Sequence, residues 1–138
     1  MKHIFIISVL TLLCRTSFAQ AGLPIRGSDW GKSDEHIKSR LLSEPGFERY
    51  RVNDGDGTRI VIYRSVDGMR EMLAYSFRND SLVAVTRSMP LQYARYITPS
   101  TSWKQVEINQ WLIEGENIWI KRYYNGQFIE DRIHRIHL

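Results

Sequence analysis

The sequence predicts an α+β fold: a single antiparallel sheet of about five to seven strands built from hairpins, with one or two short helices packed on one face. Two hairpin patterns carry this prediction. β-Prone runs flank Asn79-Asp80 and Asn125-Gly126, and both dipeptides accept the positive φ of a tight turn. The third observation is a short helix pattern between Ser33 and Pro45-Gly46.

The N-terminus has the pattern of a secretory signal peptide over residues 1–19. Met1-Lys2-His3 is basic, Ile4 to Cys14 is apolar, and Ser17-Phe18-Ala19 places small residues at a cleavage site. The apolar run is shorter than the ~20 residues of a spanning helix. We therefore expect cleavage after Ala19, a periplasmic or secreted protein, and no membrane span after cleavage.

Removal of residues 1–19 would leave a single domain of modest charge. It would contain 17 basic and 15 acidic residues, a formal charge of +2, which is too small to indicate an acidic partner. Cys14 would leave with the signal peptide, so we expect neither a disulfide nor a cysteine-based metal site. Residues 20–29 are turn-rich and predict a flexible lead-in to an α+β domain over 30–138.

A helix is expected to open the domain. Ser33 is a favourable N-cap, and Asp34 adds negative charge where the helix dipole favours it. Pro45-Gly46 ends the helix. Because so short a helix is not stable alone, its Ile37 and Leu41 side chains must pack on the sheet.

Four strands in meander order are expected next, because only short turns separate the β-prone runs. They are residues 47–52, 59–64, 72–78 and 81–87.

The hairpin around Asn79-Asp80 predicts specific pairs. A two-residue turn there places Phe77 opposite Leu82, Tyr75 opposite Ala84 and Leu73 opposite Thr86. We expect Tyr75, Phe77 and Leu82 in the core.

Residues 88–115 have a mixed pattern. Pro90 suits a first helical turn and predicts a helix over 90–97, before Pro99. Residues 103–113 predict an extended, strand-forming run. The alternative is a helix that starts in the capping-box pattern of residues 102–105.

A second hairpin follows, with a two-residue turn at Asn125-Gly126. It pairs Tyr123 with Phe128, Lys121 with Glu130, and Trp119 with Arg132 in a cation–π contact. The opposite, core-facing side is predicted to carry four isoleucines: Ile118, Ile120, Ile129 and Ile133.

Arginine and exposed aromatic residues are the candidate binding residues. The mature chain has 13 arginines and four lysines. We expect Arg49 and Arg51 on one part of the sheet, and Trp119, Tyr123 and Arg132 on another, to contact a partner or ligand. The alternative interpretation is an ordinary solvated sheet face.

No motif predicts a metal or a cofactor, and we expect neither. Residues 53–58 resemble part of a calcium loop but lack its first ligand and its final glutamate. Asp131, His134 and His137 would share a face only on a helix, whereas they continue a strand. There is no nucleophile motif, and the remaining carboxylates considered, Asp29, Glu107 and Glu130, belong to no motif.

The run Asp29-Trp30-Gly31-Lys32-Ser33-Asp34, followed by a meander and by Tyr75 to Leu82, is similar to small exported bacterial α+β proteins of unknown function. The resemblance covers roughly residues 29–87. It implies a periplasmic or surface domain and transfers no catalytic residue.

We therefore expect an exported, non-enzymatic domain that binds an envelope protein or a small ligand. Export argues against nucleic acid as the partner. Two alternatives are an envelope hydrolase with an acidic site that no motif marks, and a structural or assembly factor of the envelope.

Overall fold

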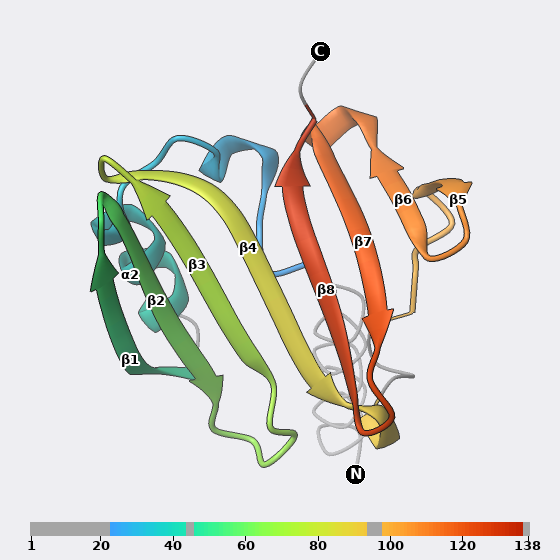
Figure 1. Cartoon of the computed structure of the whole chain (residues 1–138), viewed down its shortest axis with the longest axis horizontal. Coiled ribbons are helices and arrows are strands. Elements are labelled where there is room, and N and C mark those ends of the chain that lie inside the picture. The colour runs from blue at the N-terminus through green and yellow to red at the C-terminus, as the bar shows by residue number, and fades with distance from the viewer. Residues whose placement is uncertain (1–22, 44–45, 94–97, 137–138) are drawn as a thin grey trace, which may run out of the picture.

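The computed structural model describes residues 23–43, 46–93 and 98–136, which form one antiparallel sheet of eight strands with one α-helix and short 3-10 turns (Figure 1). The α+β class is confirmed, and the strand number exceeds the predicted five to seven. The elements are η1 (Gly27–Asp29), α2 (Asp34–Ser43), β1 (Phe47–Gly55), β2 (Thr58–Ser65), β3 (Met72–Arg78), β4 (Ser81–Pro90), β5 (Lys104–Glu107), β6 (Gln110–Ile113), η3 (Glu114–Glu116), β7 (Ile118–Tyr124) and β8 (Phe128–Arg135).

The sheet consists of two four-stranded meanders joined at their last strands. The strand order is β1-β2-β3-β4-β8-β7-β6-β5, so β4 pairs with β8 at the centre and β1 and β5 form the two edges. The predicted meander of the first four strands is confirmed. Each meander therefore runs from an edge of the sheet to its centre, and the two halves have the same topology.

The two faces of the sheet differ. We call the face against which α2 packs the inner face and the opposite one the outer face; in Figure 1 the outer face is turned toward the viewer. The inner face carries a continuous apolar core: Ile25, Trp30, Ile37, Leu41, Val61, Tyr63, Leu73, Tyr75, Phe77, Leu82, Val85, Trp111, Ile118, Ile120 and Ile133. No helix of the described ranges lies across the outer face.

The helix forms as its sequence predicts. Ser33 Oγ accepts a hydrogen bond from His36 N at 3.3 Å, and Ile37 and Leu41 are buried. The segment before the helix packs more closely than the flexible lead-in that we expected. Ile25 is buried in the core, and the buried Tyr75 hydroxyl donates to Pro24 O at 2.5 Å.

The β3–β4 hairpin confirms the turn and corrects part of the register. Asn79 and Asp80 adopt positive φ, and Phe77 lies opposite Leu82. A bulge beside Phe77 then shifts the pairing, so that Tyr75 lies opposite Val85 instead of Ala84, and Leu73 opposite Arg87 instead of Thr86. The extra residue turns Val85 into the core. Tyr75, Phe77 and Leu82 are buried as predicted.

The β7–β8 hairpin is shifted by two residues from the predicted register. Asn125 N donates to Phe128 O at 3.1 Å, so Gly126 and Gln127, not Asn125 and Gly126, are the central turn residues. The observed pairs include Tyr123 with Glu130, Lys121 with Arg132, and Trp119 with His134.

The predicted β7–β8 register would have placed Ile120 opposite Asp131 and Arg122 opposite Ile129. The observed register places Ile120 opposite Ile133 and Arg122 opposite Asp131. Apolar side chains therefore face apolar partners, and the buried charged side chains face each other. A shift of two residues leaves the alternation of faces unchanged. The four predicted core isoleucines are therefore buried.

Residues 88–115 differ most from expectation. The predicted helix over 90–97 is replaced in its described part by the end of β4 and a 3-10 turn at 91–93; residues 94–97 lie outside the described ranges. Met89 and Pro90 pair with β8, which extends the strand. The run 103–113 is extended as predicted, but it folds back at Asn109, whose φ is +59°, into β5 and β6.

Within the described ranges, every helix is too short or too polar to span a lipid bilayer. The predicted signal peptide, residues 1–19, lies outside these ranges.

Candidate functional site

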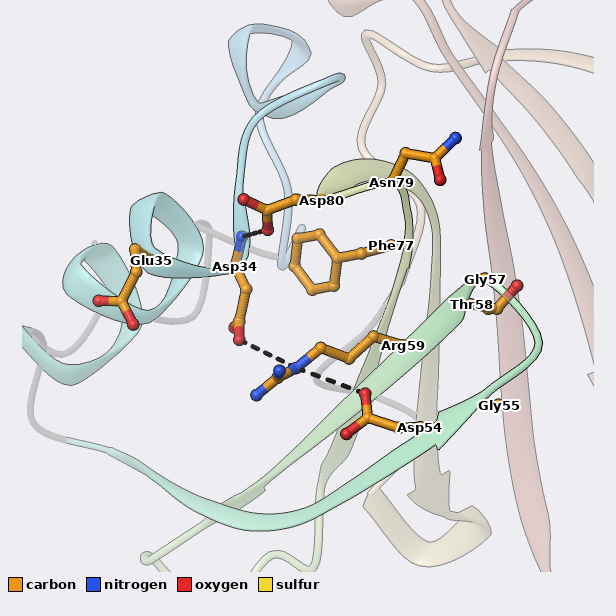
Figure 2. Close-up of a pocket in the computed structure, with 10 residues that line it drawn as sticks. All are labelled: Asp34, Glu35, Asp54, Gly55, Gly57, Thr58, Arg59, Phe77, Asn79 and Asp80. Atoms are coloured by element: carbon orange, nitrogen blue, oxygen red, sulfur yellow. Dashed lines mark hydrogen bonds and ion pairs between the residues drawn. The ribbon is translucent and has the colours of Figure 1, made fainter.

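An open depression lies where the start of α2 meets the β1–β2 and β3–β4 turns (Figure 2). Its volume is about 560 Å³. Carboxylates dominate its polar lining, which consists of Asp34, Glu35, Asp54, Thr58, Arg59, Asn79 and Asp80.

Backbone hydrogen bonds fasten the start of α2 to the β3–β4 turn. Leu82 N donates to Lys32 O at 2.9 Å, and Gly31 N donates to Leu82 O at 3.0 Å. The Asp80 side chain then accepts from Asp34 N at 3.2 Å, which satisfies one of the free amide groups at the helix start. The wall of the depression is therefore fixed by contacts between residues far apart in the sequence.

Arginines neutralise the buried carboxylate of the depression. Asp34 Oδ2 lies 3.0 Å from Arg49 Nη2. It also lies 3.4 Å from Arg59 Nε, and Asp54 Oδ1 lies 3.9 Å from the same Nε (Figure 2). Burial raises the pKa of Tyr63, the register partner of Arg49, to about 12, and the negative charge of Asp34 adds to this effect. These contacts fasten the helix to β1 and β2.

The calcium-like sequence at residues 53–58 forms the β1–β2 turn. β1 continues to Gly55, which pairs with Thr58, and Gly57 adopts a φ of +73°. Asp54 faces Arg59. Among the residues that the structure describes, no group of three or more His, Cys, Asp or Glu side chains is placed to hold a metal ion.

A second polar cluster, the Arg-Asp-Arg cluster, is buried on the inner face where β4, β8 and β7 run side by side. Asp131 accepts hydrogen bonds from Arg122 Nε at 2.7 Å, Arg122 Nη2 at 3.0 Å and Arg87 Nη2 at 3.1 Å. The Arg122 guanidinium also lies 5.2 Å from the Trp111 ring centroid. This carboxylate therefore joins the two meanders across the central β4–β8 pair.

Burial and hydrogen bonding oppose each other at Arg122. Burial alone would lower the pKa of Arg122, whereas the hydrogen bonds and charge of Asp131, together with Tyr124, raise it. The guanidinium therefore remains a charged partner of Asp131.

Sequence reasoning missed the Arg-Asp-Arg cluster, although the sequence carries a signal for it. Arg87, Arg122 and Asp131 each occupy the inward phase of an alternating strand, between or beside apolar residues. A charged residue at such a position must find a charged partner, because burial of a lone charge is costly.

Replacing Glu71 with glutamine should stabilise the protein near neutral pH. Burial raises the pKa of Glu71; Arg87 opposes the shift, and Asp67 and Asp131 add to it. Folding thus favours the protonated carboxyl of Glu71. The stability that this preference contributes is present below the ordinary pKa of the carboxyl and is lost as the pH rises through the raised pKa. Urea unfolding should show a higher midpoint for Glu71→Gln at about pH 7, with the gain disappearing near about pH 4.

The exposed Glu114, which lies 3.7 Å from Lys104 Nζ, provides the control for this prediction. Glu114→Gln should leave the midpoint almost unchanged at both pH values. A Glu71→Gln midpoint equal to or below that of the wild type near neutral pH would contradict the prediction.

On the outer face, β7 and β8 carry a group that we call the aromatic cluster: Trp119, Lys121, Tyr123, Arg132 and His134. The Arg132 guanidinium lies 4.2 Å from the Tyr123 ring centroid, and Lys121 Nζ lies 5.4 Å from it. The Trp119 and His134 rings are 6.4 Å apart. The structure thus brings the three predicted residues of this hairpin onto one surface, with Arg132 on Tyr123 rather than on Trp119.

The other two predicted binding residues are separated from the aromatic cluster and from each other. Arg49 is engaged with Asp34 at the depression. Arg51 is exposed beyond a bulge in the edge strand β1. This end of the sheet has its own cation–aromatic contact, with the Arg64 guanidinium 4.7 Å from the Tyr50 ring centroid.

Asp131 and His134, two of the residues considered for a C-terminal metal site, are not brought together. Asp131 belongs to the Arg-Asp-Arg cluster on the inner face, whereas His134 lies beside Trp119. His137 lies outside the described residues.

The three unmarked carboxylates also lie apart. Asp29, in the segment before α2, pairs with Arg40 at 2.6 Å. Glu107 accepts from Gln110 Nε2 at 3.1 Å in the β5–β6 hairpin, and Glu130 lies on β8.

Comparison of the chain with protein-family models, curated proteins and solved structures finds no match in any of the three.

Proposed function

We propose that this protein is an exported, non-enzymatic domain that binds a partner protein in the cell envelope through the aromatic cluster on its outer sheet face. The observation that carries the proposal is the gathering of Trp119, Tyr123 and Arg132 on a face that no described helix covers. Periplasmic or secreted localisation is part of the same proposal and rests on the pattern of residues 1–19.

The chemistry of the aromatic cluster suits a protein surface. Tryptophan, tyrosine and arginine are the residue types that most often dominate binding energy at interfaces. Arg132 already lies on Tyr123, so part of the ordering cost for this guanidinium is met before binding. Lys121 and Arg132 add positive charge, against the single carboxylate of Glu130 at 3.4 Å from Arg132. We therefore expect acidic side chains in the partner.

The neighbouring strands leave room for such a partner. Thr86 lies opposite Arg132 on β8 and opposite Ala74 on β3, so small side chains continue the outer face beside the cluster. Small side chains beside the aromatic cluster allow a partner surface to approach closely.

The sheet edges are less suited to binding by strand addition. β1 has a bulge between Arg49 and Arg51, and the short β5 has one between Gln105 and Glu107. Bulges and short edge strands interrupt the regular ladder that an added strand needs. This favours the face over the edges as the binding surface.

A matched pair of double variants tests the proposal. A photoreactive residue at Thr86 should first capture the partner in intact cells, and mass spectrometry should identify it. With that partner purified, Tyr123→Ala/Arg132→Ala should weaken binding by roughly 30-fold or more, since loss of interface anchors costs about 2 kcal/mol or more.

The control is Tyr50→Ala/Arg64→Ala, which removes the equivalent cation–aromatic contact at the β1–β2 end. It should leave the affinity within a few-fold of the wild type. Equal affinities of the two double variants, or no discrete adduct at Thr86, would contradict binding at the aromatic cluster.

A further inference from the structure

We propose that Asn125 is a site of spontaneous deamidation, with water as the only co-reactant. The backbone nitrogen of Gly126 attacks Cγ of Asn125, a C–N bond forms, and the side-chain nitrogen leaves as ammonia after taking up the proton of the attacking amide. Water then opens the resulting succinimide at either carbonyl and gives aspartate or isoaspartate at position 125. No electron transfer is involved.

The nucleophile of this reaction is accessible. Among the five asparagines of the chain, only Asn125 precedes a glycine, so no β-carbon crowds the attacking nitrogen. On either side, Asn125 N and Gln127 N donate backbone hydrogen bonds, at 3.1 and 2.8 Å. The Gly126 N–H has no such bond to any residue that the structure describes. Attack therefore requires no hairpin hydrogen bond of Gly126 to break.

The electrophile is activated by the same turn. Phe128 N donates to Asn125 Oδ1 at 3.0 Å. This hydrogen bond draws electron density away from Cγ, and it points at the oxygen on which negative charge develops during attack. The turn thus provides both a free nucleophile and a donor for the developing oxyanion.

The other asparagines lack this combination. Asn53 lies within β1 and pairs with Ile60. Asn79, the other exposed turn asparagine, is followed by Asp80, whose side chain is held at the start of α2. Conversion at Asn125 should therefore precede conversion at Asn79.

Conversion would change the turn locally. It adds a negative charge, and isoaspartate also places an extra carbon in the backbone of the hairpin. The adjacent Gln127 O accepts from Leu91 N at 2.8 Å, so the altered backbone lies next to the connection that follows β4.

The experiment incubates the purified protein in neutral buffer, folded and in urea, and follows ammonia release and peptide masses over time. The folded protein should convert Asn125 several-fold faster than Asn79, at a rate no lower than in urea. Gly126→Ala should slow the reaction several-fold. Gly57→Ala, at a turn glycine with the same φ of +73°, should leave the Asn125 rate unchanged.

The contribution of the Phe128 donor is tested with Phe128→Pro, which removes that N–H at the first residue of a strand, where proline is tolerated. This variant should react more slowly than wild type in buffer and at the wild-type rate in urea. Retention of Asn125 in the folded wild-type protein while the urea-unfolded chain converts would overturn the proposal. So would equal rates at Asn125 and Asn79.

Discussion

Replacing Asp131 with asparagine should lower the free energy of unfolding by about 3–5 kcal/mol, because it leaves two buried guanidiniums without their shared carboxylate. Arg87 and Arg122 are almost fully buried, and Asp131 is inaccessible to solvent. The amide of asparagine keeps the volume of the side chain but cannot neutralise either cation. Urea or thermal unfolding monitored by tryptophan fluorescence would measure the loss.

A surface ion pair on the same strand provides the control. Glu130 lies 3.4 Å from Arg132, and both side chains are well exposed, so Glu130→Gln should change stability by about 1 kcal/mol at most. If Asp131→Asn and Glu130→Gln unfolded at the same midpoint, the charge of Asp131 would have no structural role.

A triple variant separates the charge from the packing. Replacement of Arg87 and Arg122 by methionine and of Asp131 by leucine removes all three charges while filling the space. It should recover much of the stability that Asp131→Asn loses, since apolar replacements of buried ion triads are often neutral or stabilising. Failure to recover would indicate that hydrogen-bond geometry, rather than charge balance, holds β4, β8 and β7 together.

The core could be predicted from the sequence where alternation alone decides it. In β7 and β8, the predicted register was wrong by two residues, yet Ile120 and Ile133 were correctly assigned to the inner face. A shift of two residues preserves the alternation of faces. In β4 the error was a single residue, caused by the bulge beside Phe77, and it placed Ala84 opposite Tyr75 where the structure has the buried Val85. Bulges leave no clear mark in a single sequence.

The failures in residues 88–115 have a different cause. Pro90 is compatible both with a first helical turn and with the end of a strand. Pairing of Met89 with Ile129 on β8 decides in favour of the strand, and this partner is 40 residues away. Local sequence patterns contain no information about such a partner.

The candidate sites also differ in whether local sequence patterns could predict them. The aromatic cluster lies within one hairpin, so the sequence could place Trp119, Tyr123 and Arg132 near one another. The depression joins the start of α2 to two turns through contacts such as Asp34 with Arg59 and with Asp80. The meander and the packing of Ile37 and Leu41 on the sheet were predicted, but local patterns did not predict which turn residues would contact the start of the helix.

Replacing Phe77 with alanine should lower the free energy of unfolding by about 3–5 kcal/mol. Phe77 is 1% exposed, on the inner face of the β3–β4 hairpin, and its position opposite Leu82 fixes the register before the bulge. Its truncation removes the largest side chain next to the turn that closes the depression. Because Phe77 also lines the depression (Figure 2), water can enter the space left by the ring, which places the loss nearer the lower end of this range.

The bulged residue Val83 gives the matched control, since it lies on the same hairpin and is 41% exposed. Val83→Ala should cost less than about 0.5 kcal/mol, as is usual for surface substitutions. The two variants remove apolar atoms from opposite faces of one strand pair, so the difference between their urea midpoints measures which face the hairpin buries. If Phe77→Ala were as stable as Val83→Ala, the inner face would not be the core of this sheet, and the placement of α2 on it would be wrong as well.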